Sequence, residues 1–433
     1  MSRVYAALST DDDAILDRLQ RNAFQYFLNA TNPVNGLVAD TSREGSPSSI
    51  AVCGFAMSCY PIAVERGWIL RADAVTRTLT LLRFLRDGDQ SGSADATGYK
   101  GLYYHFLDMN AGQRMWRSEL SLIDSALLLA GALVSREYFT EDSAAEHELR
   151  DLVDFLYRRV DWRWSQDRGA AISHGWKPES GFLNYGWEGY SEAILLYVLA
   201  MGSPTLPATG NCYAAWTATY QWENLYGQDF LYAGPLFVHQ FSHAWIDFRG
   251  IRDAFMREKK SDYFENSKRA VLVQQKYCEL NPHGFTGYGT NVWGLTACDG
   301  PNDGMSNVGR HSQRLFGYAA RGVPYGPDDG TIGGWSALAS LPFAPEIAMR
   351  AARTMLAENP EIVPDGMYSS SVNATLAQQD GRAWVSSGHF GLDQGIMVMM
   401  IENYRSGLIW RLMRGCEYIR KGLAATGFRG GWL

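Results

Sequence analysis

The chain has 433 residues, of which 46% are hydrophobic and 20% are charged, and this balance indicates a protein with a large apolar core. Its formal net charge of −7 and the lack of any Lys/Arg cluster argue against a nucleic-acid partner. Since no run of about eighteen apolar residues occurs and the first residues lack the pattern of a secretory leader, we expect no membrane span and a cytoplasmic chain as written, or a periplasmic one if a signal peptide was trimmed.

Helical periodicity dominates the chain. An acidic triplet after Ser9 and Thr10 marks the start of the first predicted helix, and Pro345 with Glu346 marks the start of a later one. The predicted helices are 13–28, 49–66, 72–86, 119–138, 144–159, 190–201, 234–243, 261–279, 345–358, 392–405 and 408–421. Residues 101–106 and 113–116 flank a turn and predict a β-hairpin, and 363–371 is predicted to be extended.

The order of these elements limits the fold class. The absence of βαβ alternation excludes Rossmann and TIM-barrel architectures. Helices joined alternately by short turns and by long loops rich in Gly, Trp and Asp favour helical hairpins arranged in a ring, with the long loops at one end. No low-complexity linker divides the sequence. We therefore predict one all-α domain over residues 1–433, with a small β-hairpin at the cleft end.

The cysteines and histidines do not predict a metal site. The six cysteines include no CxxC pair and mostly lie in apolar stretches, which is typical of buried thiols. His239 and His243 are spaced like the histidines of HExxH, but the sequence HQFSH lacks the glutamate that would follow the first one. We expect these two side chains to bind sugar hydroxyls or to make hydrogen bonds in the core, and we expect no metal and no cofactor.

Glu192 is the leading candidate for a general acid. It stands at the start of the predicted helix 190–201, behind a loop rich in glycine and aromatic rings. A helix that is apolar on nearly every face is expected in an inner layer, where partial burial raises the pKa of a carboxyl group, as an acid working near neutral pH requires. The alternative is a first-turn residue favoured by the helix dipole. Asp393, in SSGHFGLDQG, repeats the arrangement and strengthens the prediction for both residues.

Two more acidic residues, Glu119 and Asp124, fall at the start of the predicted helix 119–138. Five residues correspond to a net rotation of roughly 140° around a helix, so we do not expect them to share a narrow face. For Asp124, which lies among apolar residues, a structural hydrogen bond is as good an interpretation as catalysis. Cleavage of a glycosidic bond needs two carboxyl groups that flank the bond, and the chain offers several.

Long motifs in a fixed order indicate a known family. These motifs are NGLVADTS, AVCGFAMSCYPIAVERGW, GLYYHFLDMNAG, SELSLIDSALLLAGAL, WEGYSEAILLYVLAMGSPT, FVHQFSHAWIDFRGIRD, GLTACDGP, LPFAPEIA and GLDQGIMVMMIENYRSGLIW. On these motifs the chain resembles, over nearly its whole length, the bacterial glucoamylase-like proteins of glycoside hydrolase family 144. The resemblance implies an (α/α)6 toroid that hydrolyses β-1,2-glucan with inversion of the anomeric centre. One departure is Leu206, which follows SPT where family members often have a histidine.

The resemblance also implies roles for particular residues. Glu192 in YSEA looks like the general acid, Asp393 in GLDQG is the leading candidate for the base, and Glu119 and Asp124 match acidic positions that line the cleft. Eight further residues are expected to contact a glucan, five through their rings and three through hydroxyl contacts. The rings are those of Trp116, Tyr185, Trp187, Trp293 and Trp335, and the hydroxyl contacts are those of His243, Arg249 and Asp299.

Other functions remain as alternatives at this point. One is a transglycosylase or a sugar isomerase or epimerase on the same toroid, and another is a non-catalytic glucan-binding protein. The four acids at loop and helix-start positions argue against binding alone, which depends more on rings and hydroxyl contacts. The residues leave open endo or exo action, which carboxylate is the base, linkage specificity beyond the resemblance, linear or cyclic glucan, and the oligomeric state.

Overall fold

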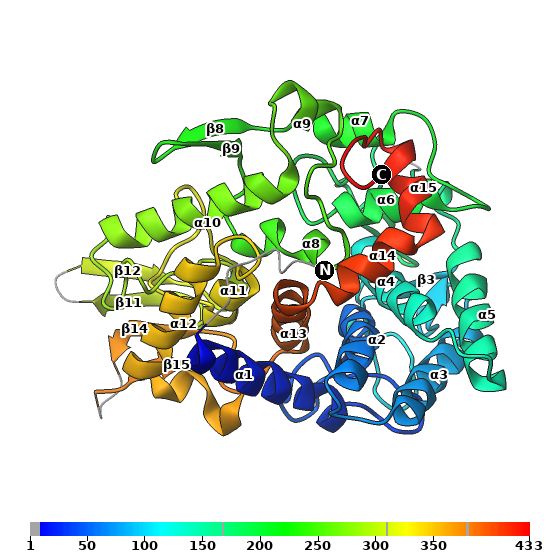
Figure 1. The fold of residues 1–433 in the computed structure, drawn as a ribbon, viewed down its shortest axis with the longest axis horizontal. Coiled ribbons are helices and arrows are strands. Elements are labelled where there is room, and N and C mark those ends of the chain that lie inside the picture. Colours follow the sequence, from blue (N-terminus) through cyan, green and yellow to red (C-terminus); the bar gives the residue numbers. More distant parts are fainter. Residues whose placement is uncertain (1–8, 167–168, 309–310, 378–380) are drawn as a thin grey trace. The chain divides into compact units, whose positions relative to one another are not determined.

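The computed structural model describes residues 9–166, 169–308, 311–377 and 381–433, and many more of these residues lie in helices than in strands (Figure 1). The described residues form two compact units. Unit 1 contains those within Met1–Gln25, Gln221–Phe241 and Phe264–Ser406, and unit 2 contains those within Tyr26–Tyr220, Ser242–Tyr263 and Gly407–Leu433. The expectation of one domain over 1–433 stays a prediction.

The long helices of unit 2 alternate between an inner and an outer layer in chain order. The inner helices, buried on nearly every face, are α2 (Ile50–Glu65), α4 (Leu122–Tyr138) and α6 (Ile194–Gly202). The outer helices, buried on one face, are α3 (Arg71–Asp87), α5 (Ala144–Arg158) and α15 (Glu417–Ala425). The remaining helices of this unit are η1 (Trp164–Gln166), α7 (Cys212–Thr217), most of α8 (Phe241–Trp245), α9 (Ala254–Glu258) and α14 (Leu408–Gly415). The apolar composition of the inner helices accounts for this arrangement, because a helix that is hydrophobic all round must be covered on all sides.

Glycines bring the inner helices α2 and α4 into close contact. A Cβ atom at Gly131 would lie 1.9 Å from the carbonyl oxygen of Gly54, and one at Gly54 would lie 2.3 Å from the carbonyl oxygen of Leu127. Backbone therefore meets backbone at this crossing, and no flexible side chain is available to give way. The two glycines fix the separation of the helices.

Replacing Gly131 by alanine is expected to lower the free energy of unfolding by about 1–3 kcal/mol, because overpacking outweighs the gain of about 1 kcal/mol in helix propensity. Urea denaturation measures the change. The control is Gly415→Ala in α14, where a Cβ would meet nothing within 4 Å and stability should hold or rise slightly. Equal stability of the two variants would contradict the close crossing.

A five-stranded antiparallel sheet of unit 2 has the order β2-β3-β5-β6-β7. Its strands are β2 (Gly98–Tyr99), β3 (Leu102–Tyr104), β5 (Leu120–Ser121), β6 (Gly175–Lys177) and β7 (Gly181–Phe182). A two-stranded sheet pairs β1 (Ser48–Ser49) with β4 (Phe106–Leu107). The predicted hairpin is present in shorter form, since Met115 N–H donates to Phe106 O at 2.9 Å and Asp108 N–H to Gln113 O at 2.7 Å. Residues 102–104 instead pair with β2 and β5.

Unit 1 combines helices with two-stranded antiparallel sheets. Its helices are most of α1 (Thr10–Asn29) and of α10 (Tyr263–Leu280), η2 (Leu236–His239), α11 (Gly334–Ala339), α12 (Pro345–Glu358), η3 (Pro360–Ile362), η4 (Pro364–Gly366) and α13 (Gly391–Arg405). The paired strands are β8 (Trp222–Leu225) with β9 (Gln228–Leu231), β10 (Ala297–Cys298) with β13 (Ala319–Ala320), β11 (Gly304–Val308) with β12 (His311–Leu315), and β14 (Val372–Ala377) with β15 (Ala383–Val385). Within this unit α13 is buried almost all round, and Gln20 of α1 donates to Val398 O at 3.0 Å and to Glu402 at 3.0 Å.

The predicted helices are confirmed in most places, with corrections at several. The prediction of one helix over 234–243 is wrong, because these residues form the short 3-10 helix η2 and the start of α8. Helix 190–201 begins at Ile194, and 408–421 divides at Cys416 into α14 and α15. The range 363–371 includes the short helix η4, and its strand begins at Val372. The six cysteines are free and buried, as predicted. Among the residues that the structure describes, no helix has both the length and the apolarity needed to cross a membrane.

Candidate active site

Glu192 lies in a tightly held turn just before α6. The backbone N–H of Trp187 donates to Ile172 O at 2.7 Å, and that of Gly189 donates to Trp216 O at 2.9 Å. The hydroxyl of Ser242 donates to the carbonyl oxygen of Glu192 at 2.7 Å. Glycine suits position 189, where φ is +76°. These bonds fix the backbone of Glu192 outside the helix, which begins at Ile194. The alternative interpretation, in which Glu192 is a residue of the first helical turn, is therefore wrong.

The carboxyl group of Glu192 is suited to keep a proton. Burial raises its pKa to about 7, and the negative charge of Asp124 acts in the same direction. The residue is nevertheless partly exposed to solvent. A partly accessible carboxyl group that holds its proton near neutral pH has the properties of a general acid.

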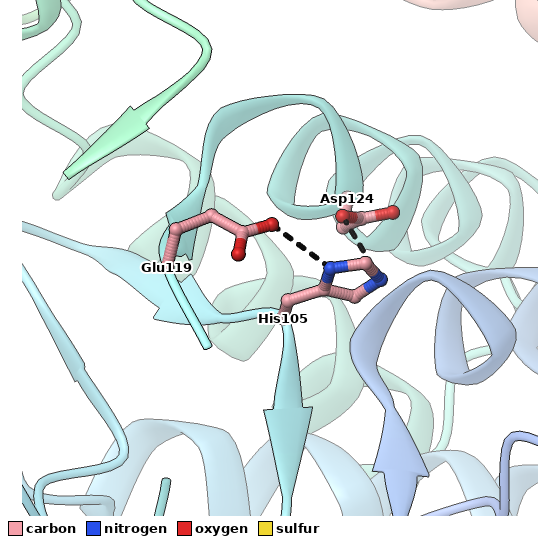
Figure 2. Close-up of side chains that lie close together, drawn as sticks. All are labelled: His105, Glu119 and Asp124. Atoms are coloured by element: carbon pink, nitrogen blue, oxygen red, sulfur yellow. Dashed lines mark hydrogen bonds and ion pairs between the residues drawn. The ribbon is translucent and has the colours of Figure 1, made fainter. Parts of the chain in front are cut away.

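Glu119 and Asp124 meet at a third side chain, that of His105 (Figure 2). The ring atom Nδ1 of His105 lies 2.9 Å from Glu119 Oε1, and Nε2 lies 3.5 Å from Asp124 Oδ2. The rotation predicted between the two acids assumed that both stand on one helix. This assumption is wrong, because α4 begins only at Leu122 and Glu119 lies before β5. Antiparallel pairing of β3 with β5 places residue 105 beside residue 119, and His105 N–H donates to Glu119 O at 2.9 Å.

Asp124 also takes part in the N-terminal cap of α4. Its backbone N–H donates to Ser121 Oγ at 3.2 Å, and the Ser121 hydroxyl donates to Asp124 Oδ2 at 2.5 Å. This is the structural hydrogen bond considered from the sequence. The oxygen that accepts from Ser121, Oδ2, is also the one that lies 3.5 Å from Nε2 of His105, so the cap orients the carboxylate beside the ring without excluding a catalytic role.

The charges of this cluster are coupled. Burial alone would lower the pKa of His105, but the charges of Asp124 and Glu119 outweigh it and raise the value to about 9. Burial would raise the pKa of Glu119, but the hydrogen bond and charge of His105 outweigh it and lower the pKa. Burial raises the pKa of Asp40 to about 6, with His105 opposing the rise and Asp124 adding to it. Near neutral pH the cluster therefore holds an imidazolium beside ionised Glu119.

His105, Glu119 and Asp124 are also the one group of three potential metal ligands among the described residues, with ligand atoms within 4.8 Å of one another. A metal ion would take one nitrogen of the ring and lie about 2 Å from each ligand atom. Here each ring nitrogen faces its own carboxylate at a hydrogen-bond or ion-pair distance. The arrangement fits a shared proton better than an ion, and the absence of a metal stays a prediction.

Three of the predicted aromatic contacts are accessible and lie in unit 2. Trp116 is 65% exposed and Tyr185 is 73% exposed. Trp187 is partly exposed and stacks on His174 with ring centroids 4.1 Å apart. The ring of Trp116 lies against Phe106, which stacks on His105. Open rings beside the carboxylate cluster are what a sugar-binding surface requires.

Three other predicted contacts are corrected by their burial. Trp293 and Trp335 of unit 1 are 0% and 1% exposed, so neither ring offers a face to a sugar. His243 of unit 2 is buried with its ring packed against Phe248, and its carbonyl oxygen accepts from Trp410 at 2.7 Å. These side chains belong to the core.

The remaining predicted residues keep their roles as predictions. Arg249 donates to both carboxylate oxygens of Asp247, at 2.8 and 2.7 Å, which gives it a structural contact in unit 2. In unit 1, Asp299 is partly exposed and accepts from the Ser386 hydroxyl at 2.8 Å. Asp393 is buried in the first turn of α13, and its negative charge acts to raise the pKa of the Cys298 thiol.

Two residues of the cluster, His105 and Asp40, were missed from the sequence. Both lie in motifs that carried the family resemblance, GLYYHFLDMNAG and NGLVADTS, which was the available signal. Periodicity could not find them, because neither stands in a helix and their partners are brought near by strand pairing.

The chain is similar to known proteins over most of its length. It is 26% identical to the exo β-1,2-glucooligosaccharide sophorohydrolase (non-reducing end) of Parabacteroides distasonis, across 95% of this chain and 57% of that protein, so it spans little more than half of that relative. The solved endo-β-1,2-glucanase of Chitinophaga pinensis, in complex with sophorotriose and glucose, is 26% identical with a TM-score of 0.83, covering 99% of this chain and 100% of the other.

A second solved structure and a family model agree with these similarities. The structure, from Bacteroides uniformis, is of a protein described as a "putative glucoamylase"; it is 29% identical with a TM-score of 0.86 and covers 99% of this chain and 100% of the other. Residues 184–417 match the model of the Glycoamylase family, which carries the same description. Because this match covers more than half of the chain, the protein belongs to the glucoamylase-like Glycoamylase family.

Proposed function

We propose that this protein is a glycoside hydrolase of the family 144 type that cleaves β-1,2-glucan by an inverting acid and base mechanism. The sophorohydrolase and endo-glucanase activities of two relatives support this substrate. The observation that carries the proposal is a contrast within unit 2. Glu192 holds a proton up to about pH 7, while the pKa of Glu119 is lowered by His105. One acid is thus ready to donate a proton while a carboxylate close to the same cluster is ionised.

We also propose that the fold is the (α/α)6 toroid of these enzymes. The alternation of inner α2, α4 and α6 with outer α3, α5 and α15 supports this architecture in unit 2. In unit 1, α13 is buried almost all round while α12 is buried on one face, which is the same contrast. The TM-score of 0.86 over 99% of the chain adds support from the fold of a relative.

In the proposed reaction, Glu192 gives its proton to the glycosidic oxygen of the leaving sugar. A carboxylate on the opposite side removes a proton from water, which attacks the anomeric carbon and inverts its configuration. Asp393 is the leading candidate for this base, and Asp124 and Glu119 are the other two. The base is the residue whose amide variant loses as much kcat as Glu192→Gln while KM changes little.

The test is incubation of the purified protein with linear β-1,2-glucan, followed by proton NMR of the first anomer released. Initial release of the α-anomer supports inverting hydrolysis, and initial release of the β-anomer contradicts it. Release of sophorose alone indicates exo action, whereas a mixture of longer oligosaccharides indicates endo action. Longer or cyclic products would show transglycosylation, and intact glucan at every pH would overturn the proposal.

Trp116 should contribute to glucan binding through stacking. Its ring is 65% exposed, and the residue has a left-handed backbone with φ +54°, which is strained for a side chain of this size. Trp116→Ala is expected to raise KM about five- to tenfold, for a loss of about 1 kcal/mol of stacking, with little change in kcat. Steady-state kinetics on β-1,2-glucan oligosaccharides measure the change.

The control for Trp116 is Phe155→Ala on the outer helix α5, where a ring that is 49% exposed is removed far along the chain from the loops of the cluster. Its KM should equal that of the wild type. An unchanged KM for Trp116→Ala would remove Trp116 from the substrate contacts.

A further inference from the structure

Both ring nitrogens of His105 face groups that can accept a hydrogen bond. Nδ1 lies 2.9 Å from a Glu119 oxygen, and Nε2 lies 3.5 Å from an Asp124 oxygen. A neutral imidazole carries one N–H and one bare nitrogen, and the bare nitrogen would face a carboxylate oxygen that only accepts. Only the imidazolium offers a proton on both sides. The geometry of the ring therefore requires the charged form when both carboxylates are ionised.

The backbone and a neighbouring ring hold His105 in this orientation. It occupies the single position between β3 and β4, its N–H donates to Glu119 O at 2.9 Å, and its carbonyl oxygen accepts from Ile50 N–H at 3.3 Å. The ring stacks on Phe106 with centroids 3.9 Å apart and planes 15° from parallel. With both nitrogens committed to carboxylates, the ring is not free to donate to a leaving group or to attack a sugar.

We propose that His105 is a positioning residue for the hydrolysis proposed above, and that its imidazolium holds Glu119 and Asp124 oriented and keeps Glu119 ionised, so that the transferable proton of the site resides on Glu192. This inference rests on the proposed function for its catalytic consequence. The charge state of His105 itself can be measured without substrate.

The charges that surround His105 explain why the imidazolium matters. The pKa of His105 is raised directly by the negative charges of Asp124, Glu119 and Asp40. The charge of Asp124 also acts to raise the pKa of Glu192. Two other cationic groups act on these acids: Arg43 acts to lower the pKa of Asp40, and Lys177 acts to lower the pKa of Glu119. The charge of Glu119 also acts to raise the pKa of His174. Removing the imidazolium leaves four acidic groups close together with less positive charge to balance them. Such a group of carboxylates takes up protons at higher pH.

The sign of the effect on activity follows from this. In the wild type, activity falls at alkaline pH as Glu192 loses its proton near its pKa of about 7, and it falls at acidic pH as Glu119, which the proposal requires in ionised form whether or not it is the base, takes up a proton. Without the imidazolium, Glu119, whose pKa His105 lowers, is protonated at higher pH, so the acidic limb of the profile moves upward while the alkaline limb stays or also rises. His105→Gln is expected to lower kcat roughly 10- to 100-fold, as misplacement of a reacting group does, with a smaller change in KM.

The experiment combines a titration with a kinetic profile. Proton NMR of the histidine rings, with the signals of His105 identified by their loss in His105→Gln, should show His105 still protonated at pH 8 in the wild type. Asp124→Asn, which keeps the shape of the side chain, should make His105 lose its proton at lower pH. A ring that titrates near the ordinary histidine value of about 6.5 in the wild type would overturn the proposal.

Kinetics on β-1,2-glucan complete the test. The matched control is His147→Gln, because His147 also pairs with a carboxylate, at 2.7 Å from Asp142, but on the exposed surface of unit 2. His147→Gln should leave the profile unchanged, and His105→Lys, which keeps a positive charge, should recover part of the activity lost in His105→Gln. An unmoved acidic limb in folded His105→Gln would overturn the positioning role. A wild type without activity on the glucan would overturn the proposed function instead, while the NMR titration still decides the charge of His105.

Discussion

Glu192→Gln is expected to lower kcat on β-1,2-glucan by about 10²- to 10⁴-fold, the range that a general acid contributes. Glutamine keeps the size and the hydrogen-bonding edge of the side chain but has no proton to give to the leaving oxygen, so KM should change little. Wild-type activity should fall as pH rises through about 7, because Glu192 is active in its protonated form and burial raises its pKa to about 7. Initial rates measured over a range of pH give both results.

The matched control is Glu188→Gln. Glu188 is exposed in the same loop, ahead of the turn that holds Glu192, and its replacement should leave kcat and the alkaline limb unchanged. A Glu192→Gln protein that keeps more than a tenth of the wild-type kcat would assign the acid to another group. If the residual activity of Glu192→Gln still fell as pH rose through about 7, a group other than Glu192 would determine the alkaline limb of the pH profile.

The same variant gives a readout that does not depend on substrate. Glu192 has a pKa of about 7 in the folded protein and an ordinary value of 4.5 when unfolded, so the folded state binds the proton more tightly. The stabilisation that the folded protein gains from this tighter binding of a proton is therefore complete below about pH 4.5 and is lost as pH rises through about 7. Relative to the wild type, Glu192→Gln should become more stable between these two pH values. Chemical denaturation at pH 5 and pH 8 measures the difference.

The sequence predicted the ends of a helix correctly where neighbouring residues in the chain determine those ends. The helix 345–358 begins at Pro345 as predicted, because proline in the first turn needs no hydrogen-bond donor and Glu346 suits the helix dipole. The helix 408–421 was predicted as one, but the backbone at Cys416 is extended with ψ 117°. No proline marks this break. Tertiary packing of α15 on α6, where a Cβ at Gly422 would lie 2.0 Å from Val198 O, accounts for a turn that periodicity does not encode.

The site was predictable only in part for a similar reason. Glu192 was found because an acid next to an apolar helix is visible in a short window of sequence. His105 was not, because its hydrogen-bond partner lies 14 residues further along the chain and comes close through the register of β3 with β5, in which Tyr104 faces Leu120. The assignment of Trp293 and Trp335 to the substrate was wrong because the sequence marks a ring as large and apolar but does not tell which face, if any, is open.

A buried ion pair in unit 1 supplies the second large expected effect. Arg321 and Asp329 both have fully buried side chains, and Arg321 donates through Nε to Oδ1 and through Nη2 to Oδ2, each at 2.8 Å. Its guanidinium also donates to the carbonyl oxygens of Cys298 and Phe316, both at 2.9 Å, and of Gly317 at 3.2 Å. Burial alone would raise the pKa of Asp329, but Arg321 outweighs it and lowers the pKa. One side chain thus binds a carboxylate, the end of strand β10 and the loop segment that contains Phe316.

Arg321→Met is accordingly expected to lower the free energy of unfolding by about 3–5 kcal/mol, because it leaves Asp329 as an uncompensated buried charge and frees three carbonyl oxygens. The control is Arg83→Met, which removes an equally short pair with Glu148 from the surface, where about 0–1 kcal/mol is expected. Arg321→Met combined with Asp329→Asn should be less unstable than the two single changes added together, since the second change removes the charge that the first one strands. Urea denaturation of the wild type, Arg321→Met, Asp329→Asn, the double variant and Arg83→Met measures all of these terms. Additive losses, or equal losses for Arg321→Met and Arg83→Met, would mean that the buried pair acts as two separate polar groups rather than as one unit.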